Sequence, residues 1–410
     1  MTITETTHTV TTELTEQCKR DLLELTQLPT AAGKEQRVVN WVEQWCVSRS
    51  GVVLAADTHG NLTLSLDASL SSVRRDEPAV YFTAHMDHPA MVVERVVSPH
   101  TLELSLRGGV MASYLENAKV RVVGSDDTTW KGTLVEKMEF DETNQPADGF
   151  TRYICETDEE CHANVGDIAM WDLPQAEIID GILHTNACDD LAALAAALDA
   201  FDRLRERAQA GDSVQDVRVL LTRAEEIGFI GAIGACRDET MPKNARVIAL
   251  ENSRAFADVP IGGGPIVRVG DRLSIFSPRL TSSCATAAEE VFGRSALPRA
   301  SQKQSEMTGT PWQRKLMAGG ACEATVFCAA GYDATCLCLP LGNYHNMGDL
   351  AAVQEGTNTD KPTLAREHIA ISDYLGLVDL LVACGTKLPE RLPIDDRIES
   401  LWIKHNDVLK

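Results

Sequence analysis

VRVLLTRAEEIGFIGA, residues 217–232, is the stretch that decides the fold this sequence predicts. Five of its first six residues are apolar or β-branched, which indicates a buried strand, and the glycines after the acid pair indicate a turn into a short helix. Glu225 and Glu226 therefore follow the C-terminal end of a strand, where open α/β sheets bind ligands. Adjacent glutamates are usually solvated surface residues, but at this edge they are also candidates for one metal ligand and one general base.

The composition is ordinary for a globular enzyme and disfavours two classes of partner. The chain has 410 residues, 44% hydrophobic and 24% charged, which is enough for two domains or for one domain with an insertion. Its net charge of −22 disfavours binding to nucleic acid or to an anionic membrane. No apolar run reaches spanning length and the polar start lacks a signal peptide's plan, so we expect a cytoplasmic protein. The twelve cysteines form no paired C-x-x-C framework, and we expect reduced core residues.

A second group of polar residues follows another predicted strand. Two segments with helical spacing occupy the region before residue 50, and AVYFTA, residues 79–84, indicates a buried strand that leads into His85-Met86-Asp87. His85 and Asp87 are two residues apart, so their side chains point to the same side of an extended chain. Asp87 could then orient His85 as a metal ligand; the alternative is a polar loop edge that happens to carry a histidine.

From about Met91 to Leu173 the sequence changes to short β-type runs broken by Gly, Asp, Thr and Asn. We interpret this segment as a small β domain inserted into the main domain, where it could shape substrate access or an oligomer contact. The predicted organisation is the first part of the main domain over residues 1–90, the inserted β domain over 91–176 and the second part of the main domain over 177–410.

More acids and a histidine stand at the ends of later predicted elements. Asp189 and Asp190 precede an Ala- and Leu-rich helix, where N-capping explains one of them and a bridge between two metals is a second interpretation of Asp189. Glu251 ends the apolar run RVIALE, and His345 lies just past another buried strand. The amphipathic tail, residues 366–385, predicts a C-terminal helix.

Two imidazoles and three carboxylates thus stand near strand ends or strand-to-helix turns: His85, Asp189, Glu226, Glu251 and His345. Mixed nitrogen and oxygen ligands suit Zn²⁺, Co²⁺ or Mn²⁺ better than Ca²⁺ or Mg²⁺. We therefore predict an α/β fold in which helices flank a mostly parallel central sheet, with a small inserted β domain and a divalent-metal site at the sheet edge.

Several motifs occur together in one order along the chain: His85-Met86-Asp87, Asp189-Asp190, Glu225-Glu226-Ile227-Gly228 with Gly231-Ala232, Glu251, Gly264-Pro265 and His345. In this order and approximate spacing the sequence resembles the M42 metallopeptidases, the glutamyl and deblocking aminopeptidase group, which is related to the co-catalytic zinc peptidases of the M20 and M28 families. The resemblance covers nearly the whole chain, and the Glu-Glu-x-Gly-x-x-Gly-Ala segment is its most specific part.

The resemblance implies two divalent metal ions per chain, zinc with cobalt or manganese as alternatives. The implied ligands are His85 and Glu251 for one metal, Glu226 and His345 for the other, and Asp189 as the bridge. Glu225 would be the general base that takes a proton from water activated by the metals, and Asp87 would orient His85. The implied activity is that of an aminopeptidase acting on short peptides, and the implied assembly is a homo-oligomer.

Two departures from the family pattern leave other activities open. The fifth ligand is typically aspartate in the family's aminopeptidases but is Glu251 here, as in several carboxypeptidase and deacylase relatives. The family's Gly-Thr-Asp-Ala is replaced by residues 320–324, GACEA, where Glu323 could take over a contact to substrate. The alternatives are a metallo-carboxypeptidase, a dipeptidase or an N-acyl amino acid deacylase on the same metals, and a non-catalytic, metal-stabilised assembly protein.

Overall fold

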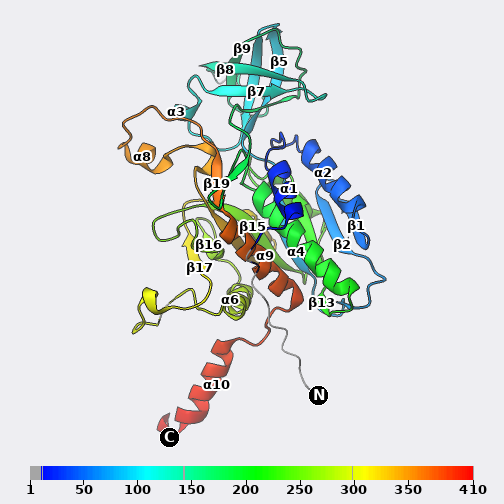
Figure 1. Ribbon diagram of the computed structural model, residues 1–410, viewed down its shortest axis with the longest axis vertical. Coiled ribbons are helices and arrows are strands. Elements are labelled where there is room, and N and C mark those ends of the chain that lie inside the picture. Colours follow the sequence, from blue (N-terminus) through cyan, green and yellow to red (C-terminus); the bar gives the residue numbers. More distant parts are fainter. Residues whose placement is uncertain (1–10, 12, 142–143, 298, 410) are drawn as a thin grey trace.

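The computed structural model describes residue 11 and residues 13–141, 144–297 and 299–409. These residues build a large α/β domain and a small β-barrel, which lies above it in Figure 1. The predicted α/β class with a mostly parallel central sheet is confirmed.

The central sheet has the strand order β1-β2-β14-β4-β15-β18-β16-β17 among the described residues. β14, β4, β15 and β18 run parallel to one another in its middle, because their apolar sequences can be buried on both faces. The strand bounds are β1 Val52–Ala56, β2 Leu62–Leu66, β4 Val80–His85, β14 Val217–Thr222, β15 Arg246–Arg254, β16 Ile266–Asp271, β17 Gln313–Met317 and β18 Asp333–Leu341.

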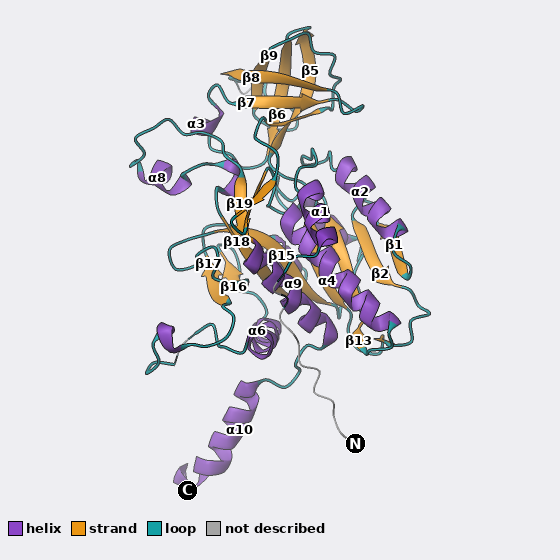
Figure 2. Ribbon diagram, in the orientation of Figure 1, coloured by secondary structure: helices purple, strands orange, loops and turns teal. Residues whose placement is uncertain are grey.

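Helices cover both faces of this sheet, and Figure 2 shows α1, α2, α4, α6 and α9, the helices of one face. Val80 and Phe82 of β4 pack in one core with α1, α2, α4, α6 and α9, whereas Tyr81 points to the other side, into a core with α5 and α7. The helix bounds are α1 Glu16–Leu25, α2 Gln36–Val47, α3 Ala112–Leu115, α4 Leu191–Gln209, α5 Ile230–Arg237, α6 Pro278–Phe292, α7 Glu323–Ala329, α8 Leu350–Glu355, α9 Ile371–Thr386 and α10 Pro393–His405, with single 3₁₀ turns at Gln304–Glu306, Tyr344–Asn346 and Asn406–Leu409.

The barrel closes in the strand order β10-β5-β6-β9-β8-β7 around its own apolar core. Its strands are β5 Ala90–Ser98, β6 Thr101–Arg107, β7 Lys119–Val123, β8 Thr129–Lys137, β9 Arg152–Thr157 and β10 Ile168–Trp171. The barrel lies within the stretch that the sequence marks as β-rich, while the predicted division of the chain into domains at 90/91 and 176/177 stays a prediction.

The C-terminal region differs from the single helix predicted over residues 366–385. Its first residues form β19 (Glu367–Ala370), which pairs with β12 (Ile182–Thr185) beside β11 (Glu177–Ile179). Helix α9 follows and is buried at most positions, because it packs against α4 and α6 rather than presenting one face to water. A further helix, α10, comes after it. The remaining short strands, β3 (Val73–Arg74) and β13 (Val214–Gln215), pair with each other.

Two observations bear on the cysteines and on the apolarity of the helices in the described part of the chain. All twelve cysteines are free, and ten of them are buried, as expected for reduced core residues. Within the described ranges, no helix combines the length and apolarity that crossing a bilayer requires.

Candidate metal centre

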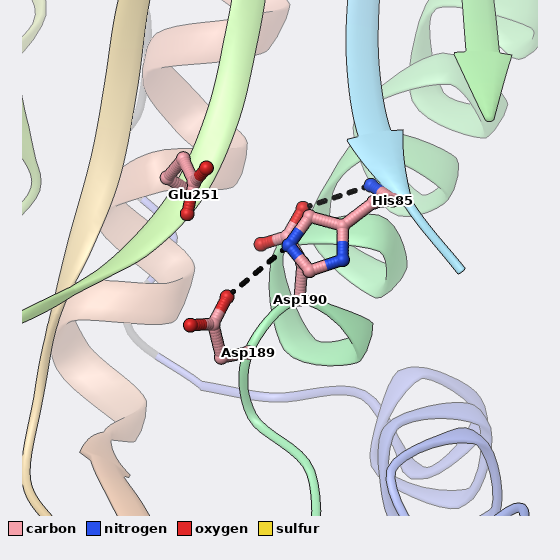
Figure 3. A group of neighbouring side chains, drawn as sticks. All are labelled: His85, Asp189, Asp190 and Glu251. Atoms are coloured by element: carbon pink, nitrogen blue, oxygen red, sulfur yellow. Dashed lines mark hydrogen bonds and ion pairs between the residues drawn. The ribbon is translucent and has the colours of Figure 1, made fainter. Parts of the chain in front are cut away.

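The five predicted ligands meet at the carboxyl edge of the parallel strands. Strand β4 ends at His85, Glu226 follows β14, and Glu251 lies within the C-terminal half of β15. Asp189 precedes α4, and His345 follows β18. Parallel strands bring their C-terminal ends to one edge, so residues far apart in sequence share one site. Figure 3 shows His85, Asp189, Asp190 and Glu251 gathered there.

Asp189 lies between the two histidines. Its Oδ1 is 3.4 Å from His85 Nε2, and its Oδ2 is 3.5 Å from His345 Nε2. Glu226 Oε1 lies 3.3 Å from the same His345 nitrogen. Among the described residues the candidate ligand atoms form three compact groups, each with all its atoms within 4.8 Å of one another: His85, Asp189, Asp190 and Glu251; Asp189, Glu226 and His345; and His85, Glu225 and Glu226. The first two groups share Asp189. One carboxylate oxygen thus faces each imidazole, which is the arrangement a bridging ligand needs.

Unpaired oxygen atoms show that these residues fit cations. Asp189 Oδ1 and Glu226 Oε1 are buried and, apart from the ion-pair contacts to His85 and His345, have no hydrogen-bond partner. Buried polar atoms are nearly always paired in proteins, because leaving one unpaired costs about 1–3 kcal/mol. Divalent cations would satisfy both atoms, and the imidazole and carboxylate donors are those of zinc-type sites.

The pKa values of the candidate ligands are shifted by burial and by the charges of their neighbours. Burial raises the pKa of Glu251 well above its usual range, and the charge of Asp189 adds to this. Burial alone would also raise the pKa of Asp189, but His345 and His85 outweigh it and hold that pKa low. Burial opposes the charged form of His85, yet the nearby carboxylates, Glu225 first, raise its pKa well above the usual value. The site therefore holds more buried negative charge than its two imidazoles can balance.

Asp87 connects the His85-Met86-Asp87 motif to the pair Glu225 and Glu226. Its carboxylate accepts the backbone N–H groups of Glu225 at 2.9 Å and Glu226 at 3.1 Å. His85 Nδ1 lies 3.1 Å from the Asp87 carbonyl oxygen and 3.6 Å from its Oδ1. Asp87 thus contacts His85 as the sequence predicts and also fixes the backbone of the glutamate pair. Glu225 Oε2 lies 4.0 Å from His85 Nε2, beside the predicted ligands.

A buried acid from α2's N-terminus supports the turn before Glu225. Ala224 has a φ of 52°, a left-handed conformation that side chains other than glycine rarely adopt. Glu35 accepts the Ala224 N–H at 3.0 Å and the Arg223 Nε–H at 2.8 Å. These bonds hold the turn that aims Glu225 into the site, and sequence patterning gives no sign of them.

Glu367 is a second residue that the sequence analysis missed. It is fully buried in β19, and burial raises its pKa to about 7. Its Oε2 accepts the N–H groups of Cys188 at 2.7 Å and Asp189 at 3.0 Å, and its Oε1 accepts the N–H of His345 at 2.8 Å. One carboxylate therefore ties two ligand-bearing loops together.

Three further residues form hydrogen bonds that hold the predicted ligands in place: Asp190, Asn252 and His88. The Asp190 carboxylate accepts the His85 N–H at 3.2 Å and the Asn252 Nδ2–H at 2.9 Å, which leaves it little freedom to serve as a simple helix cap. The ring of His88 hydrogen-bonds through Nδ1 to the carbonyl of Asp189 and through Nε2 to Asn346. The only sign of this role of His88 in the sequence is its position three residues after His85.

Glu323 lies at the start of α7, close to Glu225 but outside the three groups of candidate ligands. It hydrogen-bonds to Thr222, and burial raises its pKa to about 7. Its Oε1 is buried without a partner. The predicted substrate contact of Glu323 stays a prediction.

A pocket opens beside Glu251 and Tyr344, whose ring stacks on His345 at 3.8 Å. Met317, Met347, Leu350 and Phe256 form apolar parts of its lining, and Arg254 and Arg268 contribute guanidinium groups. Arg268 is buried and donates to Ser253 Oγ at 3.2 Å, whereas Arg254 is half-exposed and donates to Gln354 at 2.6 Å. A group bound next to the metals would meet positive charge here.

Comparisons with known proteins agree with this geometry. The family model of the M42 glutamyl aminopeptidases matches residues 65–292, more than half of the chain. A comparison with curated protein sequences gives no match.

Solved structures share the fold at low sequence identity. The TET1 peptidase of Pyrococcus horikoshii is 18% identical, with a TM-score of 0.68 over 90% of this chain and 100% of that one. A TET aminopeptidase from a marine-sediment Thaumarchaeota archaeon is 17% identical, with a TM-score of 0.69 over 92% and 98% of the two chains. An aminopeptidase from Desulfurococcus kamchatkensis is 18% identical, with a TM-score of 0.66 over 92% and 96%.

An α/β sheet with imidazoles and carboxylates gathered at its carboxyl edge defines a metallohydrolase. The chain belongs to the M42 glutamyl aminopeptidase family. It is a metal-dependent aminopeptidase, a hydrolase of peptide bonds, as the sequence motifs predict.

We expect Glu367→Gln to weaken metal binding by about 10- to 100-fold, because an amide cannot accept all three of the N–H bonds that Glu367 accepts. The measurement is the dissociation constant for Zn²⁺ of the metal-stripped protein by competition with a chromogenic chelator. Glu355→Gln, at the end of α8, is the matched control and should bind like the wild type. Equal affinities for both variants would contradict the role assigned to Glu367.

Proposed function

We propose that the chain removes N-terminal residues from short peptides with the help of two divalent cations. His85 and Glu251 would hold one cation, Glu226 and His345 the other, and Asp189 would bridge them. The observation that carries this proposal is the position of Asp189, with one oxygen facing each imidazole. Zinc suits the donor set best, with cobalt or manganese as alternatives.

The bound cations would polarise the peptide carbonyl and lower the pKa of a water molecule. The chain's own contribution to the reaction is then the movement of a proton. Glu225 stands with its carboxylate 4.0 Å from His85 Nε2, in a group with His85 and Glu226 but outside the two groups that share Asp189. We assign it as the general base that takes the proton from water and passes it to the leaving amine. Asp87 keeps Glu225 in place through the backbone N–H.

The pocket beside Glu251 suggests which substrate is preferred. Its apolar walls suit an aliphatic stem, and the half-exposed guanidinium of Arg254 suits a carboxylate at the end of that stem. We therefore propose a preference for acidic N-terminal residues. The guanidinium groups of Arg254 and Arg268 could instead hold the α-carboxylate of a substrate. A metallo-carboxypeptidase or an N-acyl amino acid deacylase is therefore the second candidate.

We also propose that the protein forms a homo-oligomer. The Pyrococcus horikoshii TET1 peptidase is described as assembling into a tetrahedron or a large octahedral shell, and the present chain shares its fold along nearly its whole length. The resemblance of the fold supports assembly.

We expect Glu225→Gln to lower kcat by about 10²- to 10⁴-fold while metal content stays at the wild-type level, since an amide cannot take a proton but the ligands remain. The measurement pairs turnover of an aminoacyl anilide with elemental analysis of the same sample. Its control is Glu226→Gln, which should lose metal as well as activity. A Glu225→Gln protein that is active and loaded with metal would remove Glu225 from the role of base.

We expect the wild type to prefer glutamyl anilide to leucyl anilide, and Arg254→Gln to reduce that preference about tenfold or more through loss of a charged contact. The measurement is kcat/KM for both anilides. Arg272→Gln, an exposed arginine outside the pocket lining, should leave the preference unchanged. Hydrolysis of N-acyl amino acids with no anilide turnover would favour the second candidate instead.

A further inference from the structure

Helix α10 (Pro393–His405) projects from the body of the protein, at the bottom of Figure 1. None of its residues is buried. An isolated helix of this length is marginally stable in water, because few backbone hydrogen bonds offset the cost of nucleation. A helix of 13 residues that stands clear of its own domain therefore calls for a packing partner.

Three apolar residues of α10 and one histidine are spaced as in a helix-pairing seam, whereas Ile403, 68% exposed, lies on the opposite face of the helix. Ile394, Ile398, Leu401 and His405 follow one another at intervals of four, three and four residues, which places them on one stripe of the helix. Trp402 lies beside the stripe. The three aliphatic residues and Trp402 are between 50% and 59% exposed, far more than core residues of the same types. A contiguous apolar face of this kind marks an interaction site.

The α/β domain of the same chain does not cover this stripe, because contacts at the N-terminal end of α10 hold the helix away from the domain. Leu388 and Leu392 of the preceding linker are buried. Arg279 of α6 pairs with Asp395 at 3.1 Å and donates to the carbonyl of Glu390 at 3.0 Å. These contacts fix the direction in which α10 leaves the domain, so its partner comes from another molecule.

The charges of α10 disfavour a membrane as that partner. A helix that lies on an anionic bilayer carries several basic residues on its polar face. Here Arg397 and Lys404 stand against Asp395, Asp396 and Glu399. The spacing of the stripe instead matches the seam of a helix pair, in which the partner has the same repeat.

The residues beside the stripe fit a second α10 in one orientation. Arg397 and Lys404 flank one side of the stripe, and Trp402 flanks the other. In a parallel pair the two different flanks face each other, so Arg397 of each helix lies next to Trp402 of its partner, a favourable cation–π contact. In an antiparallel pair like flanks meet, which sets Arg397 against Lys404. The helix is therefore complementary to itself when the two copies run parallel.

We propose that α10 joins two copies of this chain by parallel pairing along the stripe Ile394, Ile398, Leu401 and His405. The inference goes beyond the proposed peptidase function and does not depend on the metal centre. His405 occupies a seam position, where a polar residue fixes the alignment of the helices and weakens the pair. Because the seam spans about two heptads, the pair adds to other subunit contacts instead of holding an assembly alone.

The test is cross-linking of the full-length chain through single introduced cysteines. In a parallel pair Leu401 faces Leu401 of the other copy, whereas Ser400 points away from the seam. We expect Leu401→Cys to give a covalent dimer under mild copper-catalysed oxidation in at least about fivefold higher yield than Ser400→Cys. The wild-type chain supplies the background from Cys18 and Cys328, the two cysteines that are not buried.

Two further variants make the result decisive. Adding Ile398→Asp to Leu401→Cys should abolish the cross-link, because it sets two charges against each other in the seam. Adding His405→Leu should raise the cross-linking yield at low protein concentration. Cross-linking that is equal at positions 400 and 401, or that persists with Ile398→Asp, would overturn the proposal, and so would its absence at all concentrations. Peptidase activity is measured separately, so failure of the metal-centre assignments would leave this result unaffected.

Discussion

The concentration of buried carboxylates around Asp189 is the constraint on which the rest of the structure depends. Asp189, Asp190 and Glu251 lie within one group of atoms, and Glu226 lies within the next, with two imidazoles to balance them. Two like charges 4 Å apart repel by about 4 kcal/mol at the effective dielectric constant of a protein site near the surface. Divalent cations between these groups would relieve that repulsion, and the buried oxygens of Asp189 and Glu226 that lack a hydrogen-bond partner are suited to bind them. Ions bound there would support both the chemistry and the stability of the fold.

The scaffold holds the backbone of four of the five candidate ligands, His85, Asp189, Glu226 and His345, with side-chain carboxylates. Asp87 holds the glutamate pair, Glu35 holds the strained turn before it, and Glu367 holds the loops of Asp189 and His345. Each of these acids is fully buried and accepts two or more N–H groups. Candidate ligands held in this way would need little rearrangement to bind a metal. Hydrogen-bond partners of this kind therefore affect metal affinity.

The gathering of the five candidate ligands could be predicted from the sequence because most of them stand at or just beyond the end of an apolar run, and the ends of parallel strands share an edge. The β strands of the barrel could also be predicted, because their apolar runs are short and broken by turn residues. Glu35 and Glu367 could not be predicted: they act on residues nearly 200 and 180 positions away, and neither stands at a recognisable motif. The C-terminal region was misread because β19 is short and α9 is buried on all sides, so its pattern does not distinguish a surface helix from a core element.

The central claim is that Asp189 serves two metals at once, and metal stoichiometry tests it most directly. The experiment is calorimetric titration of Zn²⁺ into metal-stripped wild-type protein and into the Asp189→Asn variant. We expect about two equivalents per chain for the wild type, and weakened binding of both in the variant, because each cation loses a charged oxygen. A single equivalent in the wild type, or a variant that loses only one of the two sites, would contradict a bridging role for Asp189.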